Sequence, residues 1–308
     1  MASVLIGVES AFKTIATDGF VVPVNSSSVK GSKNQNSAAT IRGNLNPVEP
    51  FDGNWSVGGQ VVVPVDSLAF WYWLRLAFGN PTTSGASSPY THVYKAGTAR
   101  PSFTIEHQFT ELATDKFFQY TGCKISGMSI SAGDDGELIA TFDVVGAVET
   151  IASSSFDSTP TTLTLTRLKN THLSLKEGGS AISNAKMVDF NINFNLDTNQ
   201  YVIGGGGVLG SLPDGIMSVS GNLNALFEDT TILTKAIAGT ESSLELTFTG
   251  SASSTLIIDF NEVKYTPNSP GIEGPQGISI SMPFNAYYDN DASETSVLVT
   301  LINTDAHA

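Results

Sequence analysis

The chain has 308 residues, of which 15 are basic and 29 acidic, so its formal net charge is −14. This charge excludes tight DNA or RNA binding through a basic patch, because an acidic surface repels phosphate. The single cysteine, Cys123, excludes an internal disulfide and every cysteine-based zinc motif, and it suits a reducing cytosol.

No segment is typical of a secreted or membrane protein. The N-terminal run M-A-S-V-L-I-G-V-E-S lacks a basic region ahead of its apolar residues, so we expect no signal peptide. The longest strongly apolar stretch, residues 68–74, is far shorter than the ~18 residues that span a bilayer. We therefore expect a protein with no membrane partner.

Two segments predict long loops. Residues 25–39 are polar and of low complexity, and we expect a loop or arm that becomes ordered only against a partner. Residues 203–208 contain four consecutive glycines and predict a flexible insertion. Long loops of this kind are commonly functional.

Two segments predict helices, one in each half of the chain. Asp66 and Ser67 provide an N-cap for the apolar run L-A-F-W-Y-W-L-R-L-A-F, which ends at Gly79. The second predicted helix is T-I-L-T-K-A-I-A, with acidic residues before it and Gly239 after it. Both are short, so helix is a minor part of the predicted fold.

The first predicted helix contains four consecutive aromatic residues, Phe70, Trp71, Tyr72 and Trp73. Helical periodicity spreads them around the circumference, so one side packs on the protein's own sheet and another needs a second surface. Two alternatives follow: a helix buried within one chain, or a helix wedged between subunits. On the second alternative, these four residues are candidates for a subunit interface.

Most of the remaining chain alternates polar and apolar residues with the period of a β-strand. The clearest case is V-D-F-N-I-N-F-N-L (188–196), in which the two kinds of residue separate completely. The other predicted strands are 102–109, 122–131, 137–145, 161–168, 244–249, 278–284 and 296–302. Asp134-Asp135-Gly136 predicts a hairpin turn between two of them. The predicted class is all-β with minor α.

Two pairs of short motifs recur in the same order. D-G-N-W-S-V-G-G (52–59) resembles D-G-I-M-S-V-S-G (214–221), and G-M-S-I-S (127–131) resembles G-I-S-I-S (277–281). Each D-G-x-x-S-V motif precedes its half's predicted helix. We therefore predict a duplication: domain 1 over residues 1–158 and domain 2 over residues 159–308, each with one short flanking helix.

No motif points to catalysis, a metal or a cofactor. The glycine run at 204–207 lacks the G-K-[ST] of a phosphate-binding loop, and the four histidines show no ligand spacing. The acidic turn that begins at Asp289 lacks the glycine and glutamate positions of a calcium loop. Paired carboxylates of a glycoside hydrolase remain an alternative, but no pair stands out among 29 acids. We expect no enzyme and no cofactor.

Several runs, all in the right order, resemble the major tail tube proteins of long-tailed bacteriophages. In the first half they are N-L-N-P-V-E-P-F-D-G-N-W-S-V-G-G-Q, R-P-S-F-T-I-E and Y-T-G-C-K-I-S-G-M-S-I-S. In the second half they are I-S-N-A-K-M-V-D-F-N-I-N-F, S-L-E-L-T-F-T and the stretch from I-I-D-F-N-E-V-K to M-P-F-N-A-Y-Y-D. Together these runs fall within residues 40–305.

This resemblance implies β-sandwich or half-barrel tube domains that assemble into rings, which stack into a tube for DNA passage. Two domains per chain imply a ring of three copies with pseudo-sixfold symmetry, whereas one elaborated domain implies six copies; the duplication favours three. The resemblance also implies a virion tail protein, assembled in the host cytoplasm, with the tape measure, tail terminator and tip proteins as partners. DNA is expected to transit the lumen without specific binding.

An acidic or amide-lined channel would repel DNA phosphate and let the genome slide. The expected lumen residues are the polar rows of the best-patterned strands: Glu106, Gln108, Asp143, Asp189, Asn191, Asn193 and Asn195. The 25–39 arm and the 203–208 loop are candidates for contacts between rings. The competing interpretation is a non-catalytic β-sandwich adhesin or capsid decoration protein.

Overall fold

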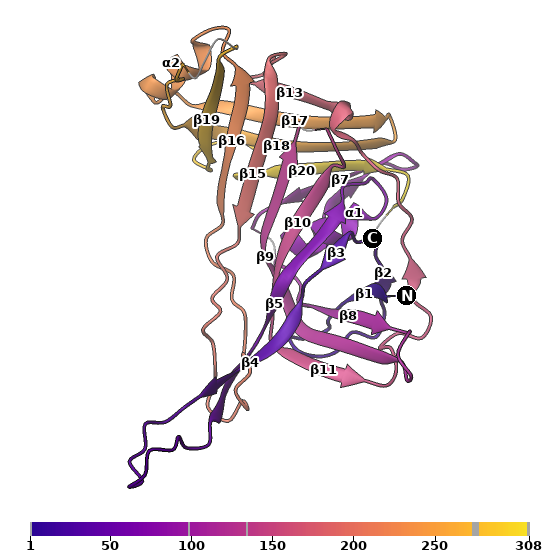
Figure 1. The fold of residues 1–308 in the computed structure, drawn as a ribbon. Coiled ribbons are helices and arrows are strands. Elements are labelled where there is room, and N and C mark those ends of the chain that lie inside the picture. Colours follow the sequence, from indigo (N-terminus) through magenta and orange to yellow (C-terminus); the bar gives the residue numbers. More distant parts are fainter. Residues whose placement is uncertain (1, 98, 134, 273–276, 307–308) are drawn as a thin grey trace.

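A long antiparallel sheet, which we call the central sheet, runs through both halves of the chain (Figure 1). The computed structural model describes all residues except 1, 98, 134, 273–276 and 307–308. The strands of the central sheet lie in the order β4 (Lys30–Asn36), β5 (Phe51–Pro64), β10 (Ile139–Gly146), β9 (Lys116–Ala132), β15 (Ala185–Asn193), β16 (Ser218–Leu226) and β19 (Ser279–Ala286). The β9–β15 pairing joins the first half of the chain to the second.

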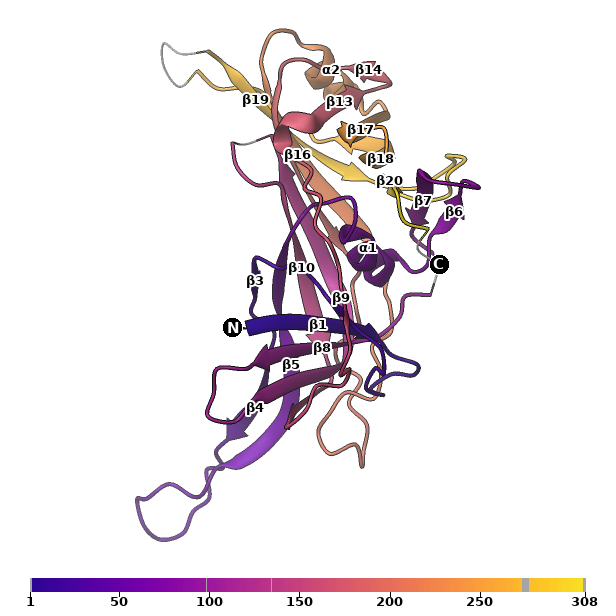
Figure 2. The ribbon, with the colours of Figure 1, turned by 90° about the vertical axis from the view of Figure 1, so that its right-hand side faces the viewer.

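A second group of strands flanks the lower part of the central sheet (Figures 1 and 2). The N-terminal part of β9 leaves the central sheet and pairs with β8 and β11. The group comprises β1 (Ala2–Val8), β2 (Phe20–Val21), β8 (Phe103–Phe109), β11 (Val148–Ala152) and β12 (Thr161–Thr162), while β3 (Ser26–Ser27) pairs with β5. This group belongs almost wholly to the first half.

A third group of strands crosses the upper end of the molecule (Figure 1). It comprises β13 (Leu173–Glu177), β14 (Ser180–Ala181), β17 (Ser242–Ser251), β18 (Ser254–Tyr265), β20 (Leu298–Asn303), β7 (Tyr90–Lys95) and β6 (Thr82–Ser84), with the short 3-10 helix η1 (Asn170–His172) before β13. Its β20–β7 pairing adds two first-half strands to a second-half sheet. The halves are therefore interwoven.

Both predicted helices are confirmed, although α1 begins two residues later than predicted, with Ala69 rather than Asp66 or Ser67 at its N-cap. For α1 (Phe70–Phe78), Asp66 Oδ1 accepts hydrogen bonds from the backbone N–H groups of Leu68 and Ala69, and Gly79 ends the helix at φ 92°. In α2 (Thr231–Ala238), Asp229 Oδ1 accepts from the N–H of Thr231, and Gly239 adopts the left-handed conformation.

The prediction of an all-β fold with minor α is also confirmed, because strands predominate among the described residues. The predicted hairpin at 134–136 connects β9 and β10, which are antiparallel neighbours, although residue 134 itself lies outside the described residues. The 161–168 prediction is wrong beyond Thr162, because the rest of that segment is an irregular connection, mostly exposed or half-buried, with an isolated bridge that joins Arg167 to Asp66. The 25–39 prediction is wrong as well, since this segment forms β3 and β4 against β5.

One apolar core serves both halves. The inward row of β15, formed by Val188, Phe190 and Ile192, is buried, and Phe190 packs edge-on against Phe260 of β18. In the first half, Trp73 of α1 stacks on Phe142 of β10 with 5.0 Å between ring centroids. The division into domains at residues 158/159 stays a prediction, since the central sheet and this core run through both halves.

Candidate assembly surfaces

The outward-facing rows of the central sheet form a polar face. Strand register places Asn191 between Ser129 of β9 and Ser220 of β16, and Asp189 between Ser131 and Asn222. The polar face consists of Gln60, Ser129, Ser131, Thr141, Asp143, Asp189, Asn191, Asn193, Ser218, Ser220, Asn222, Asn224, Ser281 and Asn285, all exposed or half-buried. Amides, hydroxyls and two carboxylates therefore cover the side opposite the core.

Five of the seven expected lumen residues lie together on or beside this face. Asp143, Asn191, Asn193 and Asn195 line one groove of about 380 Å³, and Asp189 lies further along β15. Asn195 lies just beyond the strand at φ 47°, where its Nδ2 donates to the Ile216 carbonyl. The period-two pattern of β15 thus brought Asp189, Asn191 and Asn193 to one surface, beside Asp143 of β10 and Asn195.

The electrostatics of the polar face are weakly anionic. Gln60 Nε2 donates to Asp143 Oδ1 at 2.8 Å, and partial burial raises the pKa of Asp189. Lysines lie at its margins by register: Lys30 opposite Gly58, Lys264 opposite Asn285 and Lys124 opposite Val145, the last bound by the Asp214 carboxylate. The centre of the face is therefore left to neutral polar groups and carboxylates.

The other two expected lumen residues lie on β8, away from the polar face. Glu106 is 0% exposed, and its carboxylate accepts bonds from Gln119, Ser155 and the backbone N–H of Phe156 at 2.6–2.9 Å. Gln108 is half-buried and donates to the same carboxylate. An enclosed carboxylate cannot line a channel, so Glu106 and Gln108 are instead assigned to fixing the 154–156 segment over β8.

The four aromatic residues of α1 are core residues. Phe70, Trp71, Tyr72 and Trp73 are between 0 and 6% exposed within a single chain. Tyr72 lies 5.0 Å from the Phe20 ring of β2, and Trp71 lies close to the same ring. Because its own chain already covers the helix, we assign these residues to the core rather than to a subunit interface.

The central sheet has an incompletely paired edge on each side. In the described structure, β4 pairs with no strand except β5. On the other side, β19 pairs with β16 along its whole length but with β18 only over its last three residues. Loop atoms cover part of that edge, because Thr266 N and Asn268 Nδ2 donate to the carbonyls of Pro283 and Ser281. Such edges are places where another chain can add strands.

Comparison with protein families decides the identity. A family model described as phage tail tube protein matches residues 1–286. The chain belongs to the phage tail tube protein family. No curated protein sequence matches it. Membership makes this chain a structural component of the phage virion tail, and the family implies assembly into a tube with other tail proteins.

The described part of this tail tube protein contains neither a membrane-spanning helix nor a cluster of metal-ligating side chains. Neither α-helix, nor any other described helix, is long and apolar enough to cross a membrane. Within the same residues, no three His, Cys, Asp or Glu side chains gather in a way that could hold a metal ion.

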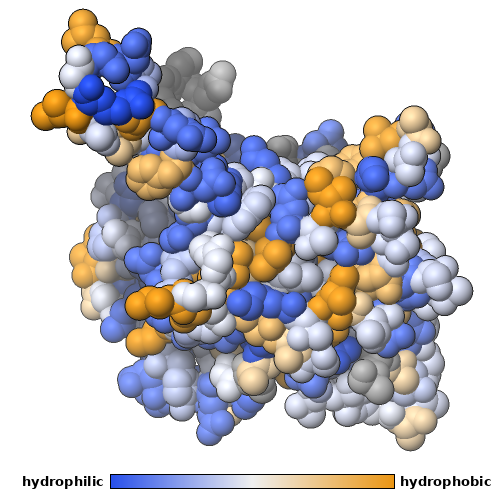
Figure 3. Space-filling view, turned by 90° about the horizontal axis from the view of Figure 1, so that it is seen from below, coloured by the Kyte–Doolittle hydropathy of each residue, from blue (hydrophilic) through white to orange (hydrophobic). Residues whose placement is uncertain are grey.

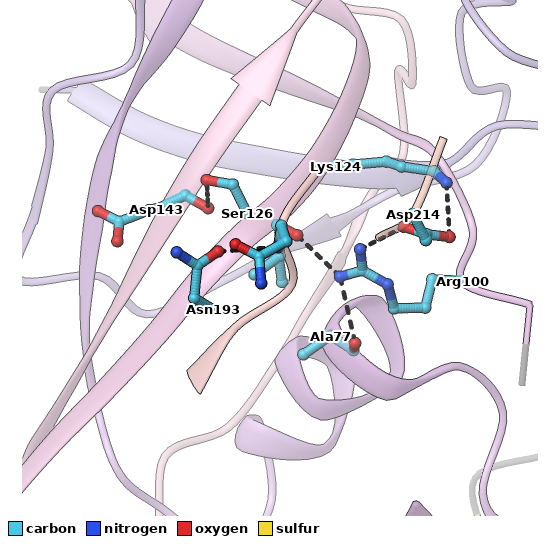
Figure 4. A network of polar contacts seen from close by, with 9 residues as sticks. Ala77, Arg100, Lys124, Ser126, Asp143, Asn193 and Asp214 are labelled. Atoms are coloured by element: carbon cyan, nitrogen blue, oxygen red, sulfur yellow. Dashed lines mark hydrogen bonds and ion pairs between the residues drawn. The ribbon is translucent and has the colours of Figure 1, made fainter. Parts of the chain in front are cut away.

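A buried arginine ties the two halves of this tail tube protein together (Figure 4). The Arg100 side chain is 6% exposed, and it donates to the carbonyls of Ala77 in α1 and Ile125 in β9. It also binds the Asp214 carboxylate and lies over the Phe194 ring at 4.0 Å. Since Lys124 Nζ reaches the same carboxylate at 3.0 Å, Asp214 bridges two cations. Sequence reasoning missed this cluster, whose members are far apart in the chain.

Below this cluster, two connections of the tail tube protein project in the same direction (Figures 1 and 2). We define the leg as residues 37–50, between β4 and β5, together with residues 194–217, between β15 and β16. Two hydrogen bonds hold the second part against β5, the strand that follows the first part: Trp55 N donates to Gly207 O, and Tyr201 Oη donates to Trp55 O. The predicted 203–208 loop is thus the tip of the second part. Seen from below, this end shows apolar and hydrophilic patches side by side (Figure 3).

Proposed function

We propose that copies of this tail tube protein associate side by side into rings whose central sheets join around a channel for DNA. The observation that carries the proposal is the central sheet itself, which has one packed face, one polar face and an incompletely paired edge on each side. Closure would place β19 of one copy beside β4 of the next. A closed barrel removes the edges that otherwise favour aggregation.

In this arrangement the polar face lines the channel. Asp143, Asp189, Asn191, Asn193 and Asn195 are the proposed lumen residues from the expected set. The carboxylates and neutral amides at the centre of this face give phosphate no cation to bind, so DNA moves past them without specific contacts. Screening limits electrostatic repulsion to about 8 Å at physiological salt, so only the lumen surface contributes.

We propose three copies per ring, with six as the alternative. Corresponding elements of the two halves follow one another in the same order: a D-G-x-x-S-V strand (β5, β16), a helix (α1, α2) and a G-x-S-I-S strand (β9, β19). The leg likewise takes one projecting connection from each half. If the halves derive from a duplication, three chains present six equivalent units.

The stacked rings form the tail tube, without catalysis, and the tube is assembled in the host cytoplasm. Its other proposed partners are the tape measure protein inside the channel and the terminator and tip proteins at its ends. Membership in the family and the polar channel that the proposal gives the protein support these partners.

Mass measurement of the purified assembly tests the proposal. We expect a species of three chain masses, and electron microscopy should show rings or hollow filaments. A species of six chain masses would support rings without the duplication. A monomer that persists at high concentration and forms no tubes on seeding would contradict the proposal.

A further inference from the structure

Large apolar side chains are exposed at opposite ends of the molecule. On the leg, Ile41, Leu45 and Ile203 are between 98 and 106% exposed, and Val202 and Ile216 are exposed with them. At the other end, which contains α2, the exposed side chains include Leu226, Ile237 and Ile278 (Figure 1). Exposed apolar surface of this kind marks interaction sites in soluble proteins.

The end that contains α2 has a groove of about 260 Å³, which we call the head groove. It lies between β14, the end of β16 and α2. Its apolar lining includes Ile182, Leu226, Ile232 and Ile280. The Glu177 carboxylate in the groove is already bound by Lys235 Nζ at 2.8 Å. The groove therefore presents apolar side chains to a ligand, and the charge of Glu177 is already neutralised within the chain.

The rim of the head groove is acidic. Glu228 and Asp229 are both exposed, and Asp229 lines the groove. Hydrogen bonds from Thr231 lower the pKa of Asp229, so this carboxylate is ionised at neutral pH. A ligand for this groove would therefore combine apolar side chains with a cation.

The tip of the 37–50 hairpin has this combination. Arg42 lies between Ile41 and Leu45, and no acidic residue occurs before Glu49. The hairpin is the part of the leg that projects farthest (Figures 1 and 2). The leg and the head groove thus match each other in apolar character and in charge.

We propose that the 37–50 hairpin of one copy docks in the head groove of a second copy in the adjoining ring. Ile41 and Leu45 cover the apolar lining, and Arg42 faces Glu228 and Asp229. The inference rests on the proposed function, since it needs rings that stack. Unlike surfaces that meet head to tail build open filaments rather than closed pairs.

Crosslinking between rings tests this contact directly. The native Cys123 is buried, so a Leu45→Cys, Ile232→Cys variant presents only its two new thiols to a bismaleimide reagent. We expect a ladder of crosslinked chains from tubes and no ladder from isolated rings. The control pair, Leu45→Cys with Leu112→Cys, has its second thiol in the exposed β8–β9 turn and should give none.

The outcomes separate the two proposals. Rings that stack into tubes without the Leu45–Ile232 crosslink, or with an equal ladder from the control pair, would overturn the docking inference alone. Absence of any ring would overturn the proposed function, and the inference with it.

A charge exchange provides an independent test. Arg42→Glu should leave the ring mass unchanged and lower the yield of tubes about tenfold, because it puts like charges together at the rim. Adding Glu228→Arg should restore the yield. Full tube formation by the single variant, or no recovery in the double variant, would contradict the contact. Leu112→Asp is the matched surface control.

Discussion

The Asp66 carboxylate fixes the backbone just before α1, and it also makes the free energy of unfolding depend on pH. Its carboxylate accepts backbone bonds at the start of the α1 region, yet the residue is 1% exposed. Burial disfavours the charged form and raises the pKa of Asp66 from 3.8 to about 6. At pH values between 3.8 and about 6, Asp66 is protonated more often in the folded protein than in the unfolded chain. Stability therefore falls as pH rises through this window.

We expect the Asp66 carboxyl to lower the free energy of unfolding by up to about 3 kcal/mol between pH 4 and 7, at about 1.4 kcal/mol for each pKa unit. Asp66→Asn keeps an oxygen acceptor for the Leu68 and Ala69 N–H groups and should flatten the decline. Asp259, whose pKa is also raised to about 6 by burial, contributes to the part that remains, as do Glu9 and Asp189, whose pKa values burial also raises. Urea unfolding across this range measures the effect. A slope unchanged from that of the wild type would contradict it.

Replacing Arg100 should destabilise residues 194–217, the second part of the leg. Arg100→Met leaves the Ala77 and Ile125 carbonyls without their donor and removes the cation over Phe194. We expect the free energy of unfolding to fall by about 2–4 kcal/mol. Hydrogen exchange in residues 194–217 should become faster. Arg167→Met is the control, since that guanidinium is largely exposed and binds one carboxylate; it should cost less than about 1 kcal/mol. Equal losses in both variants would refute a special role for Arg100.

At the scale of elements, the sequence predicted the strands and helices that have a regular pattern of polar and apolar residues or recognisable end residues. The complete alternation in β15 placed Asp189, Asn191 and Asn193 on one face, and capping residues placed both helices. β4 was missed because an edge strand exposed on both sides has no apolar row to detect. Glu106 was misplaced for the opposite reason: β8 is covered on its second side by residues 154–156, and a period of two cannot show such a cover.

Ring closure through the open edge of β19 can be tested by substituting Ser281. The Ser281 carbonyl accepts a bond from Asn268 on the side away from β16, so the Ser281 N–H points to the same open edge. Ser281→Pro removes this donor without breaking a bond to β16, and a proline at an edge blocks the addition of a strand. We expect a folded monomer by circular dichroism and mass measurement.

Ser281→Val is the matched control for that variant. It loses the same hydroxyl contact to Asn222 but keeps the backbone N–H, so it should still form rings. Ring formation by both variants would show that closure does not use this edge.

At the scale of the whole molecule, the interwoven topology was beyond sequence reasoning. The β20–β7 pairing joins strands about two hundred residues apart, and only packing around a shared core selects it. The polar face, by contrast, follows from residues whose alternation is local. Its role as a lumen can be tested by reversing its charge.

The triple variant Asp143→Lys, Asn191→Lys, Asn193→Lys changes the net charge of each chain by +4. If the polar face lines the channel, a ring of these chains surrounds DNA with ammonium groups that bind phosphate. We expect rings of unchanged mass that bind a short fluorescent duplex, with an affinity that falls steeply as salt rises. Wild-type rings should bind it only weakly at physiological salt, because no released counterions drive the association.

The control is an equal change of charge elsewhere on the surface. Asp18→Lys, Ser87→Lys and Thr240→Lys replace three exposed residues that lie off the polar face. Binding of this variant should stay well below that of the lumen variant, because its charges do not surround one duplex from all sides. Equal affinity and equal salt dependence in the two variants would mean that the polar face does not enclose DNA. The proposal that this face of the central sheet lines the channel would then be wrong.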